Sequence, residues 1–277
     1  MRRCMLTLLA SLLAAPASAQ TPIALVGGTV LPGDGAPIED ATVVIRADRI
    51  VSVTAGGAAP AGAEVLDCQG ATITPGFVGT QVPLGLVEIG LEPSTVDEAP
   101  EDDDADPIRA SFSVVDGYNP TSTLIPVARR WGVTSVVSTP SGGLVSGTSA
   151  WLDLRGATLD RLLVEERAGL HVDLGDGGIR EGGGARPSAL NRLREAFDDA
   201  RLYRQRRASF DRRGLRELSI SRLDLERMSE ALGGDLPVVV RVSRSHDILR
   251  VLALARVQGV RLVLARAEEG WMVAAQI

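Results

Sequence analysis

The side chains best suited to chemistry in this sequence are an imidazole and a carboxylate two positions apart, His171 and Asp173. They fall in the stretch 169–174, whose apolar residues predict a short strand. Residues two apart on a strand project from the same face, so this pair could share one metal ion. The simpler interpretation, which we favour, is a histidine hydrogen-bonded at a strand end, because the only other histidine is the distant His246.

A second stretch, residues 72–91, is apolar, is interrupted at Pro75-Gly76, and is predicted to continue as a strand to Glu88. The order Pro75, Gly76, Phe77, Val78 resembles the first-strand signature of the amidohydrolase superfamily. In that family Pro-Gly and two apolar residues lead into Asp-x and then His-x-His, which binds metal.

The positions of those ligands carry other residues in this sequence. Gly79 stands at the aspartate, Gln81 at the first histidine and Pro83 at the second. The resemblance implies zinc or another divalent metal as cofactor. Glutamine is a poor ligand for a transition metal and proline is none, so the ligands that the family uses are missing here.

The resemblance extends along most of the chain. Gly-Gly-Thr-Val at 27–30 matches the family's N-terminal β unit, and Val133 begins a segment similar to its second barrel strand. The strand predicted at 238–242 is similar to one that often carries another metal-binding histidine, and Arg241 holds that position. The substitutes that could still bind a metal are His171, Asp173, Glu88 and Asp116.

The apolar pattern predicts the elements that must position these residues. Four strand-length runs fall between Ile23 and Ile73. Beyond them we expect strands at 133–137, 169–174, 237–243 and 261–265, helices at 188–207, 223–232 and 245–258, and a glycine-rich loop at 175–184. Alternating strands and helices predict a parallel sheet.

We therefore expect an α/β protein with an incomplete TIM-type (β/α)8 barrel at 73–277, preceded by a small N-terminal β-sandwich unit at 20–72. A barrel usually takes ~250 residues, and about 200 are available here. Truncation is the favoured explanation, and an open half-barrel that needs a partner is the alternative.

Composition limits the partners and the compartment. The net charge is −6 and every basic residue is arginine, which argues against a nucleic-acid footprint and excludes a carbamylated lysine as metal bridge. Residues 1–19 resemble a cleavable signal peptide, with Arg2-Arg3, an apolar run and Ala17-Ser18-Ala19 before Gln20. We expect a periplasmic or secreted protein without a membrane span, because the apolar run is shorter than the ~20 residues that a span needs.

Two functions follow from these patterns. By descent the chain would be a secreted hydrolase acting on carbon–nitrogen bonds in amides or cyclic amides, with a metal activating water. The alternative is a catalytically inactive pseudoenzyme that binds a small-molecule or peptide-like ligand outside the cytoplasm. A homo-oligomer, or a subunit that completes a barrel with another chain, stays open.

Overall fold

The computed structural model describes residues 21–100, 105–156 and 158–277. The predicted signal peptide at 1–19 lies outside these residues. The chain divides into two compact units, Met1–Pro75 and Gly76–Ile277. No helix in the described ranges is both long and apolar enough to cross a membrane.

The first unit is a single five-stranded sheet, where the sequence predicted a small sandwich. Its strands are β1 (Ile23–Val30), β2 (Ile38–Arg46), β3 (Arg49–Ala55), β4 (Glu64–Asp67) and β5 (Thr72–Ile73), in the order β3-β2-β1-β4 with β5 on β1. Alternate apolar residues cover one face, where Val30, Ala41 and Val43 are buried. One sheet of this size has a small core, and β3 and β4 are exposed along their whole length.

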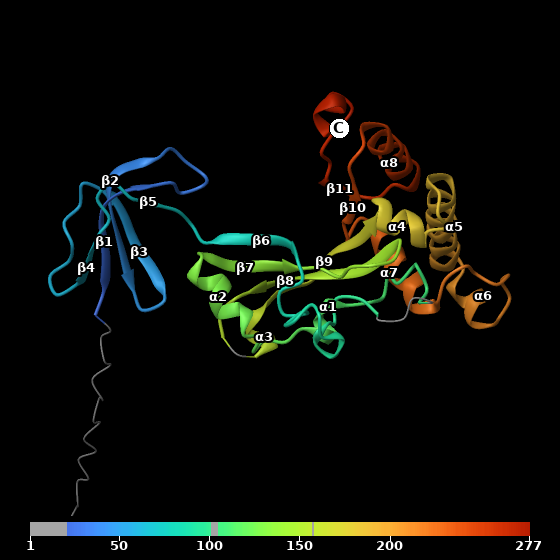
Figure 1. Cartoon of the computed structure of the whole chain (residues 1–277), viewed down its shortest axis with the longest axis horizontal. Helices are drawn as coiled ribbons and strands as arrows, with labels where there is room; N and C mark the ends of the chain where they lie inside the picture. The colour runs from blue at the N-terminus through green and yellow to red at the C-terminus, as the bar shows by residue number, and fades with distance from the viewer. Residues whose placement is uncertain (1–20, 101–104, 157) are drawn as a thin grey trace, which may run out of the picture. The chain divides into compact units, whose positions relative to one another are not determined.

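The second unit is built on a six-stranded sheet in the order β11-β10-β9-β8-β7-β6 (Figure 1). The strands are β6 (Phe77–Val82), β7 (Val133–Ser138), β8 (Val145–Asp153), β9 (Leu163–Asp173), β10 (Val238–Val242) and β11 (Leu262–Arg266). β6 is parallel to β7, and β9, β10 and β11 are parallel to one another.

The expectation of a wholly parallel sheet is wrong at β8, which is antiparallel to β7 and to β9. The reason lies in the connection, because only residues 139–144 join β7 to β8. A parallel neighbour needs a crossover of a dozen or more residues, whereas a short loop can only reverse the chain.

Along the sequence, the helices of this unit fall between its strands. They are α1 (Val114–Gly117), α2 (Leu124–Arg130), α3 (Leu159–Leu162), α4 (Asp176–Glu181), α5 (Arg186–Gln205), α6 (Arg207–Asp211), α7 (Arg222–Gly233) and α8 (Ser245–Gln258), with short 3-10 turns η1 (Pro93–Thr95) and η2 (Gly270–Val273). The three long helices that the sequence predicted correspond to α5, α7 and α8; the ends of α8 are as predicted, and those of α5 and α7 differ by at most two residues.

Two local expectations are wrong. The strand expected to reach Glu88 ends at Val82, because Pro83 has no N–H for the sheet and its carbonyl accepts from the N–H groups of Leu86 and Val87, which turns the chain. The glycine-rich loop expected at 175–184 contains helix α4. Gly178 allows that helix to pack directly on the Asp173 backbone, where a Cβ would collide.

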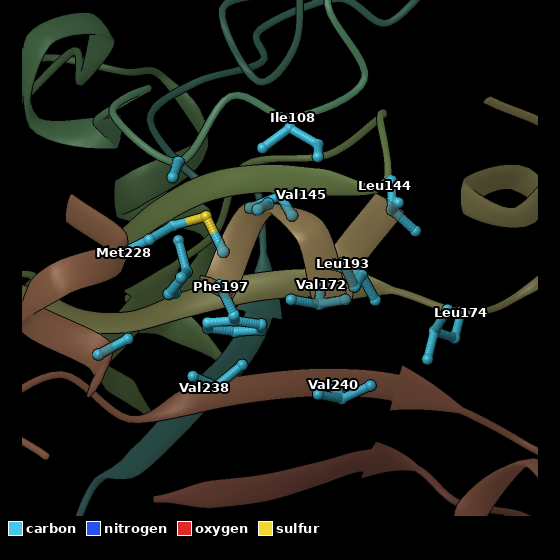
Figure 2. Close-up of a cluster of buried hydrophobic side chains, with 14 of the residues drawn as sticks. Ile108, Leu144, Val145, Val172, Leu174, Leu193, Phe197, Met228, Val238 and Val240 are labelled. Carbon is cyan, nitrogen blue, oxygen red and sulfur yellow. The ribbon is translucent and has the colours of Figure 1, made fainter. Parts of the chain in front are cut away.

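The main core lies on one face of β9 and β10. Leu170 and Val172 from β9, with Val238, Val240 and Val242 from β10, are buried there. Side chains of α5, α7 and α8, among them Phe197, Met228 and Ile248, cover them, and Figure 2 shows part of this cluster. The intervening residues of the same strands therefore face the opposite side of the sheet.

Candidate functional site

A cleft lies on that opposite side, at one end of the second unit's sheet. Its volume is about 150 Å³, and its lining includes Gln81, Pro83, Thr139, Ser146, His171, Asp173, Arg241 and Arg266. These residues come from the carboxyl ends of β6, β7, β9, β10 and β11 and from the start of the reversed strand β8. Ligands of α/β folds bind at the carboxyl ends of parallel strands, so the position favours a binding or active site.

His171 and Asp173 line this cleft from the carboxyl end of β9. The His171 Nε2 atom is buried and has no hydrogen-bond partner among the described residues. Burial lowers the pKa of His171 to about 4, because the imidazolium form would lose its hydration. The imidazole is therefore neutral at pH 7.

Asp173 is held by two neighbours. The Gly175 N–H donates to Asp173 Oδ1 at 2.7 Å, and Arg241 Nη1 lies 3.6 Å from Asp173 Oδ2. Arg241 and Asp173 are direct partners in the β9–β10 register. Both carboxylate oxygens thus face a donor or a cation, which leaves Asp173 less able to serve as a metal ligand.

Gln81 and Pro83 lie at the β6 edge of the cleft. Gln81 has a φ of 55°, in the left-handed region that a side chain such as glutamine seldom adopts, and the β6–β7 register shifts there. Such strain is found at functional sites more often than elsewhere. Gly79 is not part of the cleft lining; a Cβ there would approach Val136.

Glu88 and Asp116 lie outside the cleft lining. Glu88 accepts hydrogen bonds from Asn119 Nδ2 at 3.2 Å and Thr123 Oγ1 at 3.1 Å. A hydrogen bond from Ser122 is the main cause that lowers the pKa of Glu88. Asp116, on α1, lines a different hollow with Asp224. The structure thus brings together two of the four substitute ligands, His171 and Asp173, and separates the other two from them.

Comparison with solved structures identifies the architecture. An amidohydrolase from Thermotoga maritima matches 91% of this chain and 66% of its own length, with a TM-score of 0.75 and 24% sequence identity. The chain has an amidohydrolase fold. The expected incomplete (β/α)8 barrel with a separate N-terminal β unit is confirmed, and the likeness concerns the fold, not the activity.

Other solved structures match with much lower structural agreement. N-acetyl-D-glucosamine-6-phosphate deacetylase from Mycobacterium smegmatis matches 88% of this chain and 53% of its own, at 17% identity and a TM-score of 0.33. Molinate hydrolase matches 87% and 57%, at 16% identity and a TM-score of 0.34. The chain therefore spans between about half and two thirds of the length of these proteins. No family model and no curated protein matches the sequence.

The residues in the cleft do not fit the metal that an amidohydrolase fold implies. Nowhere in the described ranges do three or more His, Cys, Asp or Glu side chains converge. His171 and Asp173 are the pair nearest to a ligand set, and Arg241 is paired with the second of them. A cation fixed beside the carboxylate opposes the binding of a second cation there.

Arg266 also lines the cleft and was not predicted from the sequence. Arg266 is the last residue of β11, pairs in register with Val242, and has a φ of 70°. A signal for it was present, because a polar residue directly after a predicted parallel strand lies at the ligand-binding edge of the sheet. The strand expected at 261–265 stopped one residue short of it.

Proposed function

We propose that this chain is an exported, metal-independent ligand-binding protein that uses an amidohydrolase fold without amidohydrolase catalysis. One observation carries the proposal. The cleft at the carboxyl ends of the strands is retained, while the positions that resemble metal ligands hold Gln81, Pro83 and Arg241. A pocket can bind a small molecule without a metal, whereas hydrolysis of an amide needs an activated water.

The remaining side chains are poorly arranged to replace a metal. A neutral His171 could accept a proton, but a base with a pKa of about 4 is weak at neutral pH. Asp173 is engaged by Gly175 and Arg241. We therefore propose that this cleft binds a small-molecule or peptide-like ligand.

The second candidate function is hydrolysis of a carbon–nitrogen bond. Two observations favour it: the amidohydrolase fold, and the unpartnered Nε2 of His171, which could bind a metal with Asp173. Such a site would have only two protein ligands. Catalytic zinc sites ordinarily have three, and for this reason we rank hydrolysis second.

Export belongs to the proposal and is supported by sequence alone. The apolar run after Arg2-Arg3 and the Ala17-Ser18-Ala19 pattern favour cleavage before Gln20. Mass spectrometry of the protein recovered from its native host is expected to give an N-terminus at Gln20. An intact Met1 in the mature protein would contradict this part.

The deciding experiment is elemental analysis of the purified, signal-free protein, paired with hydrolysis assays on lactams and dipeptides. We expect substoichiometric zinc, iron and manganese and no turnover, together with ligand-dependent increases in melting temperature in a small-molecule and peptide screen. The test variant is His171→Leu, which changes the lining of the cleft and is expected to abolish those increases in melting temperature. Stoichiometric metal with turnover that His171→Leu removes would establish the hydrolase instead.

A further inference from the structure

We propose that the β10–β11 side of the cleft binds an oxyanion, the carboxylate or phosphate group of a small molecule, through the guanidinium groups of Arg241 and Arg266. The inference rests on the proposed ligand-binding function, because it names the chemistry of the ligand. It places an anion beside Arg241, the position that resembles a metal-binding histidine of the amidohydrolases.

The placement of the two arginines is the first argument. β10 and β11 are adjacent and parallel, and their register pairs Arg241 with Ala265 and Val242 with Arg266. The two residues therefore lie on neighbouring strands at the same end of the sheet. Arg266 pairs with Val242, which is part of the core, but its φ of 70° departs from the extended backbone of a strand, and both arginines line the cleft. A hydrogen bond from Ser243 is the main cause that lowers the pKa of Glu268, and the charges of Arg266 and Arg241 lower it further. Both guanidinium groups therefore lie near this carboxylate.

The availability of their donors is the second argument. Within the described part of the chain, Asp173 is the only ionic partner of Arg241, and the 3.6 Å contact is too long for a hydrogen bond. No ion pair joins Arg266 to any described residue. Each guanidinium therefore keeps a planar set of N–H donors that can bind a carboxylate or phosphate in bidentate fashion.

The charges across the cleft also favour this side for an anion. Glu98 and Asp173 also line the cleft. The backbone carbonyl of Glu98 accepts a hydrogen bond from the Ser141 N–H, which places Glu98 beside the connection from β7 to β8. His171 is neutral and adds no charge. Beside Arg241 and Arg266 an oxyanion would meet two cations, and it would compete with the nearby carboxylate of Glu268 for them. A volume of about 150 Å³ encloses a charged group and leaves the rest of the ligand near solvent.

The test is calorimetric titration of the signal-free protein at low ionic strength with two probes, inorganic phosphate and succinate, against a chloride blank. We expect saturable binding of at least one probe, and the stronger one identifies phosphate or carboxylate as the natural group. Arg266→Gln is expected to weaken binding at least about tenfold, since a bidentate charge-assisted contact is lost. Arg241→Gln should act in the same direction, and circular dichroism reports whether it still folds without the partner of Asp173.

The matched control is Arg261→Gln, which makes the same charge change at the other end of β11, outside the cleft lining, and should leave affinity unchanged. Equal weakening by Arg261→Gln, or no saturable binding of either probe to the folded wild type, would overturn the inference. Metal content and hydrolysis are measured on the same sample. A metal-free, inactive protein that binds neither anion refutes this inference alone, whereas a metal-loaded, active protein refutes the proposed function.

Discussion

The two faces of strands β9 and β10 carry different kinds of side chain. On one face Leu170, Val172 and Val240 are buried under side chains of α5, α7 and α8. Figure 2 shows Val172 and Val240 in this cluster. On the other face His171 and Arg241 line an open cleft. The same ten or so residues of backbone thus carry an apolar core and a polar site, separated by the two-residue period of a strand.

The two faces of this sheet place different constraints on their residues. The covered face depends on apolar area and close packing, so any polar replacement there is costly. The cleft face depends on a few side chains that touch a ligand. Those can be exchanged without loss of the fold, and in this chain the positions that resemble metal ligands have been exchanged. The following predictions test this contrast in order of decreasing effect.

The largest effect is expected from a carboxylate on the covered face. Val240→Asp should lower the free energy of unfolding by about 3–5 kcal/mol, because it buries an unpaired charge in the core. Val239→Asp, the neighbour on the cleft face, should cost about 1 kcal/mol from lost apolar contact. Urea unfolding followed by tryptophan fluorescence measures both, since Trp131, Trp151 and Trp271 all lie in the second unit. Equal costs would remove the distinction between the faces.

The next effect is a dependence of stability on pH set by His171. Its pKa is about 4 in the folded protein and 6.5 in the unfolded chain, so between these values the unfolded chain binds a proton that the folded protein does not. Stability is therefore complete above pH 6.5 and falls as the pH is lowered toward 4. Between pH 7 and 5 the wild type should lose about 2 kcal/mol relative to His171→Gln.

The chain offers a matched control for this experiment, because its only other histidine, His246, is exposed. In His246→Gln the free energy of unfolding, measured with urea at pH 7, 6 and 5, should depend on pH as it does in the wild type. If the pH dependence of the free energy of unfolding disappeared in His246→Gln and persisted in His171→Gln, the effect would belong to His246 and not to His171.

A smaller effect, of opposite sign, is expected at the β6 edge of the cleft. Gln81→Gly should raise the free energy of unfolding by about 1 kcal/mol, because glycine adopts a φ near 55° without steric cost. Thr80→Gly, one residue earlier in the strand, should lower it by about 0.5–1 kcal/mol. If Gln81→Gly lowers the free energy of unfolding instead, the glutamine side chain makes contacts that stabilise the folded protein.

The smallest effect is expected from restoring the histidines of the family motif. Gln81→His with Pro83→His should not create tight zinc binding, since Arg241 still places a cation beside Asp173. Calorimetry should detect no submicromolar uptake of zinc. Adding Arg241→His to the pair tests the cause, and an increase in zinc affinity only in the triple variant would identify the arginine as the obstacle.

Periodicity predicted most of the architecture but not its connections. The buried runs at 133–137 and 237–243 formed β7 and β10, and the amphipathic pattern from Ser188 formed most of α5. The reversed direction of β8 was not predicted, because an apolar run has the same pattern in either direction. Helix α4 was missed since glycines that usually mark loops are required there by the close approach of Gly178 to Asp173.

The candidate site was predicted in part. Gln81, Pro83, His171, Asp173 and Arg241 were singled out from the sequence, and the structure places all five at one cleft. Glu88 and Asp116 were offered on charge alone, and they lie elsewhere because the turn after Pro83 and the loops around α1 carry them away from the strand ends. Arg266 was not predicted, since its strand end was placed one residue too early.

By itself the sequence determined the alternation of apolar and polar residues on each strand, the residue types at the positions that resemble metal-binding histidines, and the absence of lysine. These are properties of residue type and spacing, which do not depend on distant contacts. Only the tertiary structure decided that Arg266 joins Arg241 beside His171 and that the His171 Nε2 is buried without a partner. The reason is physical: convergence and desolvation depend on which strands are neighbours, and strands far apart in sequence become neighbours only when the sheet forms.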